Sequence, residues 1–273
     1  MKRLFAIAAA CLLGSAVQAA PGTVDKLWRL DCGSFRVNQL NIFSDTQSYT
    51  GQTRDLVGSC YLIKDGDAYM LWDAGLPASR RGAKPDPTQP IEGRLDRTIV
   101  EQLAQLGIRP EQIGLIGISH YHFDHSGQAA DFPGAKLLIG AGDLKAVRED
   151  ASLGKPLAPW LGEGARVEGV EGDKDLFGDG SVVMIALPGH TPGHHGLLVR
   201  LPKTGAVLLT GDVAHFQENL DSDGVPTFNT DRADSLAAMD RYRKLAKAIG
   251  AVAIIQHDPR DVAKLPAFPQ GAE

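Results

Sequence analysis

Apolar and polar positions along this chain predict strands in its first third and a mixture of helices and strands after it. Alternating and apolar runs predict a strand at Leu27–Val37 and a hairpin formed by Ser59–Ile63 and Ala68–Trp72. Apolar positions at helical spacing predict a helix at 99–106 and a long helix capped by Asp231. The remaining predicted elements are strands at Ile113–Ile118, Lys136–Ile139, Ser181–Leu187, Gly196–Leu201, Ala206–Thr210 and Ala251–Ile255, and a polar helix at 142–150.

Three stretches, 41–58, 77–93 and 151–180, lack a regular pattern. The first is polar and long for a connection, and such loops are usually functional or disordered. No repeat or linker divides the chain after residue 19, so we expect one domain over 20–273. Strands, helix and strands in each half predict an α+β protein whose halves stack sheet to sheet with helices outside.

Composition narrows the class of protein. The chain of 273 residues is 43% hydrophobic and 22% charged, as expected for a globular protein. Its net charge of −5 gives no electrostatic footprint for nucleic acid, so we expect no nucleic-acid partner.

The first residues have the pattern of a secretory signal. Lys2 and Arg3 precede the apolar run Leu4–Leu13, and Val17 and Ala19 offer small residues for cleavage. The run is short for a membrane-spanning helix, which needs about 20 apolar residues, although a retained anchor is the alternative. We therefore expect a signal peptide at 1–19, a periplasmic or secreted protein, and no membrane contact after cleavage.

Two cysteines, Cys32 and Cys60, remain after the predicted leader. Both lie in predicted strands, and an oxidising compartment would permit a disulfide between them. The alternative is that they are two small buried hydrophobic residues.

The eight histidines all lie after residue 119 and mark the candidate chemistry. The stretch 119–125 reads Ser-His-Tyr-His-Phe-Asp-His and follows an apolar strand. If the stretch is extended, alternate residues share a face, so His120, His122 and Asp124 would converge while His125 points elsewhere. Imidazole nitrogens with carboxylate oxygens and no thiolate suit Zn²⁺, and less often Fe or Mn.

Three further candidates, His190, Asp212 and His257, each follow the end of a predicted strand. Four strands that end in a potential ligand indicate one shared metal site. The order HxHxDH, GHTPGH, GD and a late His resembles the metallo-β-lactamase superfamily over nearly the whole chain after the leader.

The resemblance implies a four-layer αββα metallo-β-lactamase sandwich with two Zn²⁺ per chain. It assigns His120, His122 and His190 to the first metal, and Asp124, His125 and His257 to the second, with Asp212 as the bridge. A metal-bridging hydroxide would then attack a carbonyl, and Asp124 would shuttle a proton to the leaving group.

Among members of this superfamily, the chain most resembles the N-acyl-homoserine lactonases, which degrade quorum signals. The motif at 119–127, the segments 30–33, 60–63 and 71–76, and the long 41–58 loop, which could wall an acyl-chain pocket, carry that resemblance. Several of these lactonases have Tyr three residues after the bridging Asp, where this chain has His215; we expect His215 to act beside Asp124 in catalysis. The expected partner is a small lactone or ester, and a homodimer is left open.

Other activities share this ligand set. An organophosphate (phosphotriester) hydrolase shares the whole ligand set, so sequence distinguishes it poorly from a lactonase. A class B3-like β-lactamase shares the histidines but generally lacks the bridging Asp. A glyoxalase-II-like thioesterase would carry a C-terminal extension, and a di-iron reductase would need a flavin domain. A non-enzymatic binding protein is disfavoured because every ligand is present.

Several residues outside the ligand set have two interpretations. Asp73 resembles the buried Asp that supports the metal ligands, or it is a turn residue. His194 and His195 orient the His190 loop, or they are solvated. Five aromatic residues are expected in the core more often than in a pocket: Phe43, Phe123, Trp160, Phe216 and Phe228.

Overall fold

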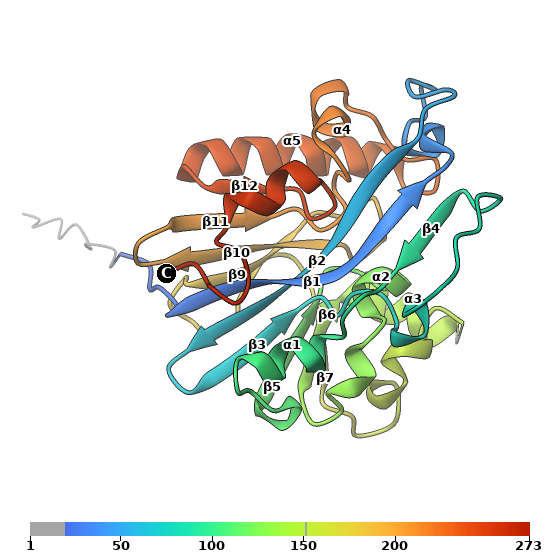
Figure 1. Ribbon diagram of the computed structural model, residues 1–273. Helices are drawn as coiled ribbons and strands as arrows, with labels where there is room; N and C mark the ends of the chain where they lie inside the picture. The colour runs from blue at the N-terminus through green and yellow to red at the C-terminus, as the bar shows by residue number, and fades with distance from the viewer. Residues whose placement is uncertain (1–19, 151) are drawn as a thin grey trace, which may run out of the picture.

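The computed structural model describes residues 20–150 and 152–273, so the predicted signal peptide at 1–19 lies outside the described residues. Within them, two β-sheets stack face to face (Figure 1). The first sheet has the order β4-β1-β2-β3-β5-β6-β7, and the second has the order β12-β11-β10-β9-β8. No helix in these residues is both long and apolar enough to cross a membrane.

The strands of the first sheet are β1 (Lys26–Val37), β2 (Arg54–Asp65), β3 (Ala68–Trp72), β4 (Ile91–Arg94), β5 (Ile113–Ile118), β6 (Lys136–Gly140) and β7 (Val167–Val170). Those of the second sheet are β8 (Lys174–Asp175), β9 (Val182–Ala186), β10 (His195–Leu201), β11 (Gly205–Leu209) and β12 (Val252–Ile254). The helices are α1 (Ile99–Gln105), α2 (Phe123–Ser126), α3 (Ala141–Glu149), α4 (Gln217–Ser222) and α5 (Arg232–Ile249).

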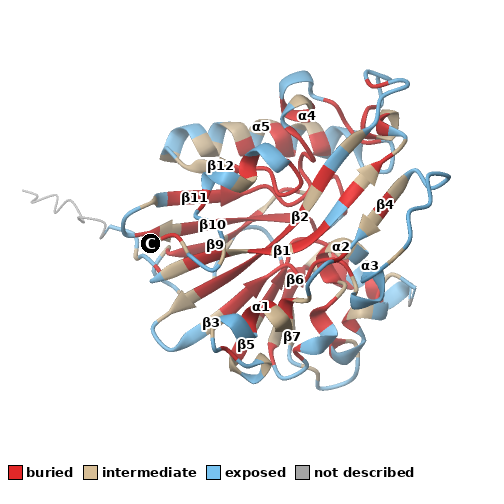
Figure 2. Cartoon of the chain, viewed as in Figure 1, coloured by how far each residue is buried: buried red, intermediate tan, exposed pale blue. Residues whose placement is uncertain are grey.

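Three apolar layers hold the sheets and helices together, and they appear as the buried interior in Figure 2. Between the sheets, Trp72 and Leu138 pack with residues of the second sheet such as Leu197. A second layer joins the first sheet to α1 and α3, and a third joins the second sheet to α5. The expected α+β sandwich with helices outside both sheets is therefore confirmed.

The long helix α5 begins where the sequence predicts. The Asp231 side chain accepts a hydrogen bond from the amide of Asp234, which satisfies one free donor of the first turn. The helix ends at Gly250, which has the left-handed φ of 62° that glycine adopts at little cost. Its buried face packs Met239 and Tyr242 against the second sheet.

The segments without a pattern are more regular than predicted. Strand β2 begins at Arg54, inside the expected loop 41–58, because Arg54 and Asp55 pair with β1 through their backbones. The side chain of Asp55 is exposed, and that of Arg54 is paired with Glu218. Similarly, β4 begins at Ile91 within the expected irregular segment 77–93. The stretch 151–180, expected to be ill-defined, contains β7, β8 and a 3₁₀ turn that buries Trp160.

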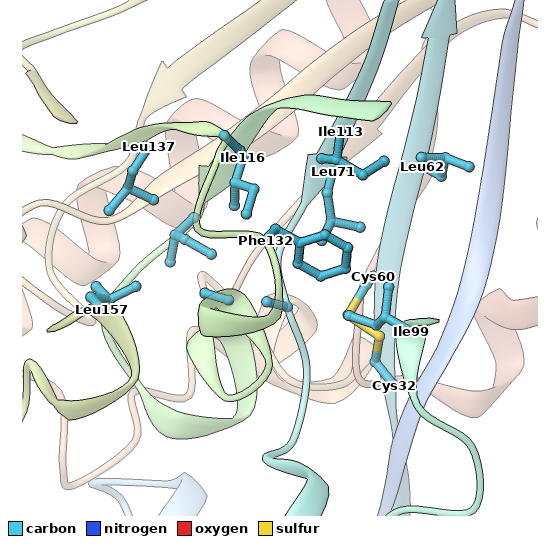
Figure 3. Close-up of a cluster of buried hydrophobic side chains, with 14 of the residues drawn as sticks. Cys32, Cys60, Leu62, Leu71, Ile99, Ile113, Ile116, Phe132, Leu137 and Leu157 are labelled. Carbon is cyan, nitrogen blue, oxygen red and sulfur yellow. A yellow bond between two sulfur atoms is a disulfide. The ribbon is translucent and has the colours of Figure 1, made fainter. Parts of the chain in front are cut away.

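Cys32 and Cys60 form a disulfide between the neighbouring strands β1 and β2 (Figure 3). A bulge between Asp31 and Gly33 shifts the register at this point of β1. Gly33 adopts φ +128°, and a Cβ there would lie 2.5 Å from Leu76. Of the two interpretations, the disulfide is the correct one.

Replacing both cysteines by alanine (C32A/C60A) is expected to lower the free energy of unfolding by about 3 kcal/mol, because the crosslink closes a loop of 28 residues in the unfolded chain. Urea unfolding with and without reductant measures the loss. Reductant should weaken the wild type and leave the double variant unchanged. Equal stability of the two proteins in oxidising buffer would contradict a stabilising crosslink.

Candidate metal centre

Strand ends deliver the candidate ligands to one place. His120 follows β5, His190 follows β9, Asp212 follows β11 and His257 follows β12. Strands β11 and β12 are parallel neighbours, so their carboxyl ends bring Asp212 and His257 to the same edge of the second sheet. Because the sheets are stacked, residues from both meet there.

The structure brings all seven predicted ligands together in two groups. The first contains His120, His122, His190 and Asp212, and the second contains Asp124, His125 and His257; within each group, the ligand atoms lie within 4.8 Å of one another.

Asp212 faces both groups. Its Oδ2 lies 3.4 Å from Nε2 of His190 and 3.7 Å from Nε2 of His120. Its Oδ1 lies 3.1 Å from Nε2 of both His125 and His257. One buried carboxylate thus presents one oxygen to each group, as a bridging ligand requires.

The expected grouping of His120, His122 and Asp124 on one face is wrong. His122 is the last extended residue, and Phe123–Ser126 form the short helix α2. Successive side chains of a helix are rotated by about 100° rather than 180°, so Asp124 is directed to the group of His125 and His257.

The donor atoms fit two bound cations. Nδ1 of His122 lies 2.9 Å from Nε2 of His120 and 3.0 Å from Nε2 of His190, and Nε2 of His125 lies 3.1 Å from Nε2 of His257. The nitrogens of His120, His122 and His190 are so close that shared protons cannot satisfy all three. In addition, Oδ1 of Asp212 is buried without a hydrogen-bond partner among the described residues. A dication in each group would satisfy these lone pairs, and nitrogen and oxygen donors without thiolate suit zinc.

The pKa values of the histidines are shifted in opposite directions in the two groups. Burial lowers the pKa of His120 and His190 well below the ordinary value, so both rings are neutral and can ligate at neutral pH. Burial also disfavours the charged form of His125, but the carboxylates of Asp212 and Asp73 outweigh it and raise its pKa well above the ordinary value. Burial would raise the pKa of Asp212, yet the surrounding histidines hold it well below the usual range.

Asp73 is fully buried and supports the second group. Its Oδ2 lies 2.9 Å from Nδ1 of His125, and its Oδ1 accepts a hydrogen bond of 2.7 Å from the amide of Ser119. Asp73 also adopts a positive φ of 59° at the end of β3. The interpretation that Asp73 supports a ligand is confirmed.

Other ligands are oriented by partners that sequence reasoning missed. Nδ1 of His190 lies 2.8 Å from Oδ1 of Asn229, and Nδ1 of His257 lies 2.7 Å from the carbonyl oxygen of Val57. Such partners fix the ring and its tautomer. Neither partner belongs to a motif, so no local signal could have identified it.

Asp143, at the start of α3, forms hydrogen bonds with both loops that carry the histidines of the first group. Its carboxylate accepts hydrogen bonds from the amide of Tyr121, the hydroxyl of Thr191 and the amide of Gly193. Tyr121 lies between His120 and His122, and Thr191 follows His190. Sequence reasoning missed this residue because its partners are about 22 to 50 positions away.

His194 and His195 are both buried, so the solvated interpretation is wrong. His194 contacts the amide of Asp212, and His195 contacts the carbonyl oxygens of Gly193 and Gly172. His194 therefore supports Asp212, and its contact with the carbonyl oxygen of Leu187 also holds the base of the His190 loop, as the other interpretation predicts.

A cavity of about 430 Å³ opens beside the two groups. Phe43 and Leu56 form part of its wall, which confirms that the 41–58 segment walls a pocket. Of the five aromatic residues expected mainly in the core, Trp160 and Phe216 are buried there, but three line the cavity: Phe43, Phe123 and Phe228. Phe123 and Phe228 are 49% and 39% exposed, so a substrate could cover them.

His215 lines this cavity next to Asp212. Its Nε2 lies 3.1 Å from Oδ2 of Asp212, and its ring packs edge-on against Phe43 and Phe228. Its Nδ1 is buried and lacks a hydrogen-bond partner in the described part of the chain.

Known proteins resemble this chain over most of its length. Residues 53–257 match the family described as the Metallo-beta-lactamase superfamily. The N-acyl homoserine lactonase AttM of Azorhizobium caulinodans is 28% identical over 86% of this chain and 93% of its own length. An N-acyl homoserine lactonase of Bacillus sp. is 27% identical over 91% of this chain and 99% of its own length. A solved quorum-quenching N-acyl homoserine lactone hydrolase superposes with a TM-score of 0.79 at 24% identity, covering 92% of this chain and 100% of the other.

Asp143 should make the stability of the metal-free protein depend on pH. Burial raises its pKa to about 6, above the ordinary value of 3.8. A raised carboxyl pKa means that the folded state favours the protonated form, so this contribution is complete below about pH 4 and is lost as the pH rises through 6. From pH 4 to 7, the wild type should lose about 2 kcal/mol of unfolding free energy relative to D143N. Urea unfolding of both chelated proteins measures this difference, and parallel pH profiles would refute it.

Proposed function

The chain belongs to the metallo-beta-lactamase superfamily and is a metal-dependent hydrolase, and we propose that it opens the lactone ring of N-acyl homoserine lactones. One observation carries the proposal: two ligand groups that share Asp212 lie beside an apolar cavity. Relatives that cover nearly the whole described chain are N-acyl homoserine lactonases, which supports this substrate class over other carbonyl compounds.

We propose that both groups hold Zn²⁺, with the ligand assignment that the two clusters suggest. When bound, two such ions lower the pKa of a water and stabilise negative charge on an attacked carbonyl oxygen. His120, His122 and His190 would hold the first ion, Asp124, His125 and His257 would hold the second, and Asp212 would contribute to both sites.

Asp124 is placed to handle a proton. Its side chain is 16% exposed, against 4% for that of Asp212, and it lines the cavity. Its Oδ2 lies 3.8 Å from Nε2 of His257. A carboxylate at the boundary between ligand group and cavity can pass a proton to the alcohol oxygen that leaves when the ring opens.

His215 and the cavity wall orient the substrate. His215 lines the cavity with its Nε2 3.1 Å from Oδ2 of Asp212, and we propose that it donates a hydrogen bond to the carbonyl oxygen of the substrate. Phe35, Val37 and Leu56 provide an apolar wall for the acyl chain, whose burial contributes about 0.8 kcal/mol per CH₂ group.

We also propose that the mature protein, residues 20–273, is periplasmic or secreted. The charge and apolar pattern of residues 1–19 supports export. The disulfide between Cys32 and Cys60 supports it independently, because such bonds persist mainly in oxidising compartments.

The purified mature chain should contain two metal ions and open an acyl-homoserine lactone rapidly. Initial rates on the lactone, a cephalosporin and an aryl phosphotriester, each with a chelated control, test the substrate class. Fast cephalosporin or phosphotriester hydrolysis with no lactone opening would overturn the substrate and retain the site. A chain without metal would overturn both.

Asp212→Ala should lower the metal content to one ion or fewer per chain and reduce kcat/KM at least about 100-fold, because both groups lose a ligand. Metal analysis after dialysis and lactone kinetics measure the two effects. Asp221→Ala, which changes an exposed carboxylate of α4, is the control and should behave as wild type. Two retained ions with full turnover would refute the bridging role of Asp212.

A further inference from the structure

The turn that carries Asp212 is held by side chains that are not ligands. The amide of Asp212 donates a hydrogen bond of 2.8 Å to Nε2 of His194, whose ring is fully buried. On the other side of that ring, Nδ1 lies 2.9 Å from the carbonyl oxygen of Leu187. A carbonyl can only accept, so Nδ1 carries the proton and Nε2 is the acceptor.

The preceding residue is held in the same way. The amide of Gly211 donates a hydrogen bond of 2.9 Å to Oε1 of Gln256. Gly211 adopts φ +56°, and a Cβ at this position would lie 2.5 Å from Nε2 of His194. The turn therefore packs directly against the imidazole, and two consecutive buried amides are satisfied by side chains.

This support determines where the carboxylate lies. An aspartate side chain has only two torsion angles, so the orientation of its backbone largely sets the position of its oxygens. In Asp212, one oxygen lies 3.1 Å from His125 and the other 3.4 Å from His190. A modest rotation of the turn would move the carboxylate toward one group and away from the other.

We propose that His194 is a positioning residue: its hydrogen bond to the Asp212 amide keeps the carboxylate shared between the two groups and thereby sets the affinity for the second metal ion. This inference rests on the proposed two-metal site. It assigns to His194 a function distinct from that of the ligands, since its own ring nitrogens are both occupied by backbone groups.

Three variants test the proposal. His194→Met introduces an apolar side chain of similar length and removes the hydrogen-bond acceptor, whereas His194→Gln retains an acceptor. His195→Met is the matched control, because His195 is also buried but contacts the carbonyl oxygens of Gly193 and Gly172. Each metal-free variant is titrated with Zn²⁺ by calorimetry, and Co²⁺-loaded samples are examined by electron paramagnetic resonance for coupling between two ions.

Wild type and His195→Met should bind two ions. In His194→Met, the second ion should bind about 10- to 100-fold more weakly, the usual effect of removing a residue that supports a ligand, and the coupling signal should weaken. His194→Gln should recover part of both losses. Wild-type affinities and coupling in a folded His194→Met variant would overturn the proposal.

A measurement on the wild type covers the case in which His194→Met does not fold. Nuclear magnetic resonance should detect scalar coupling across the hydrogen bond between the Asp212 amide nitrogen and Nε2 of His194, with and without metal. Absence of this coupling would overturn the role of His194. A wild type with the coupling but without metal binding would instead contradict the proposed function.

Discussion

A single buried carboxylate, that of Asp212, lies within 4 Å of five imidazole rings, and the rest of the centre is arranged around it. An isolated charge at this depth would be very costly, so it persists only with compensating partners. In the metal-free protein, positive charge on His125 and His257 provides this compensation. Bound cations would replace those protons, because a histidine must be neutral to ligate a metal ion.

The fold places this carboxylate where both sheets end. Its support comes from strands of the second sheet, and Asp73 reaches the same cluster from the first sheet through His125 and Gln256. The apolar layer between the sheets keeps these strand ends in register. Packing far from the centre therefore determines distances of a few ångströms within it.

The ligands could be predicted from the sequence because each lies in a short motif at the end of an apolar strand. The direction of the Asp124 side chain could not be predicted, because it depends on whether residues 123–126 continue as an extended segment or form a helix, as they do in α2. Asp143 and Asn229 could not be predicted either, because their significance arises only when distant loops meet. The same holds for β2, whose first residues are polar and become a strand only by pairing with β1.

Each ligand group draws on both halves of the molecule. In the first group, His120 and His122 follow a strand of the first sheet and His190 follows a strand of the second. In the second group, Asp124 and His125 follow the first sheet and His257 follows the second. A bound ion would therefore act as a noncovalent crosslink between the halves, and binding free energy would add to the free energy that holds the sheets together. Metal loading and docking of the two halves are then thermodynamically linked: conditions that separate the sheets release the ions, and high free metal concentration opposes that separation.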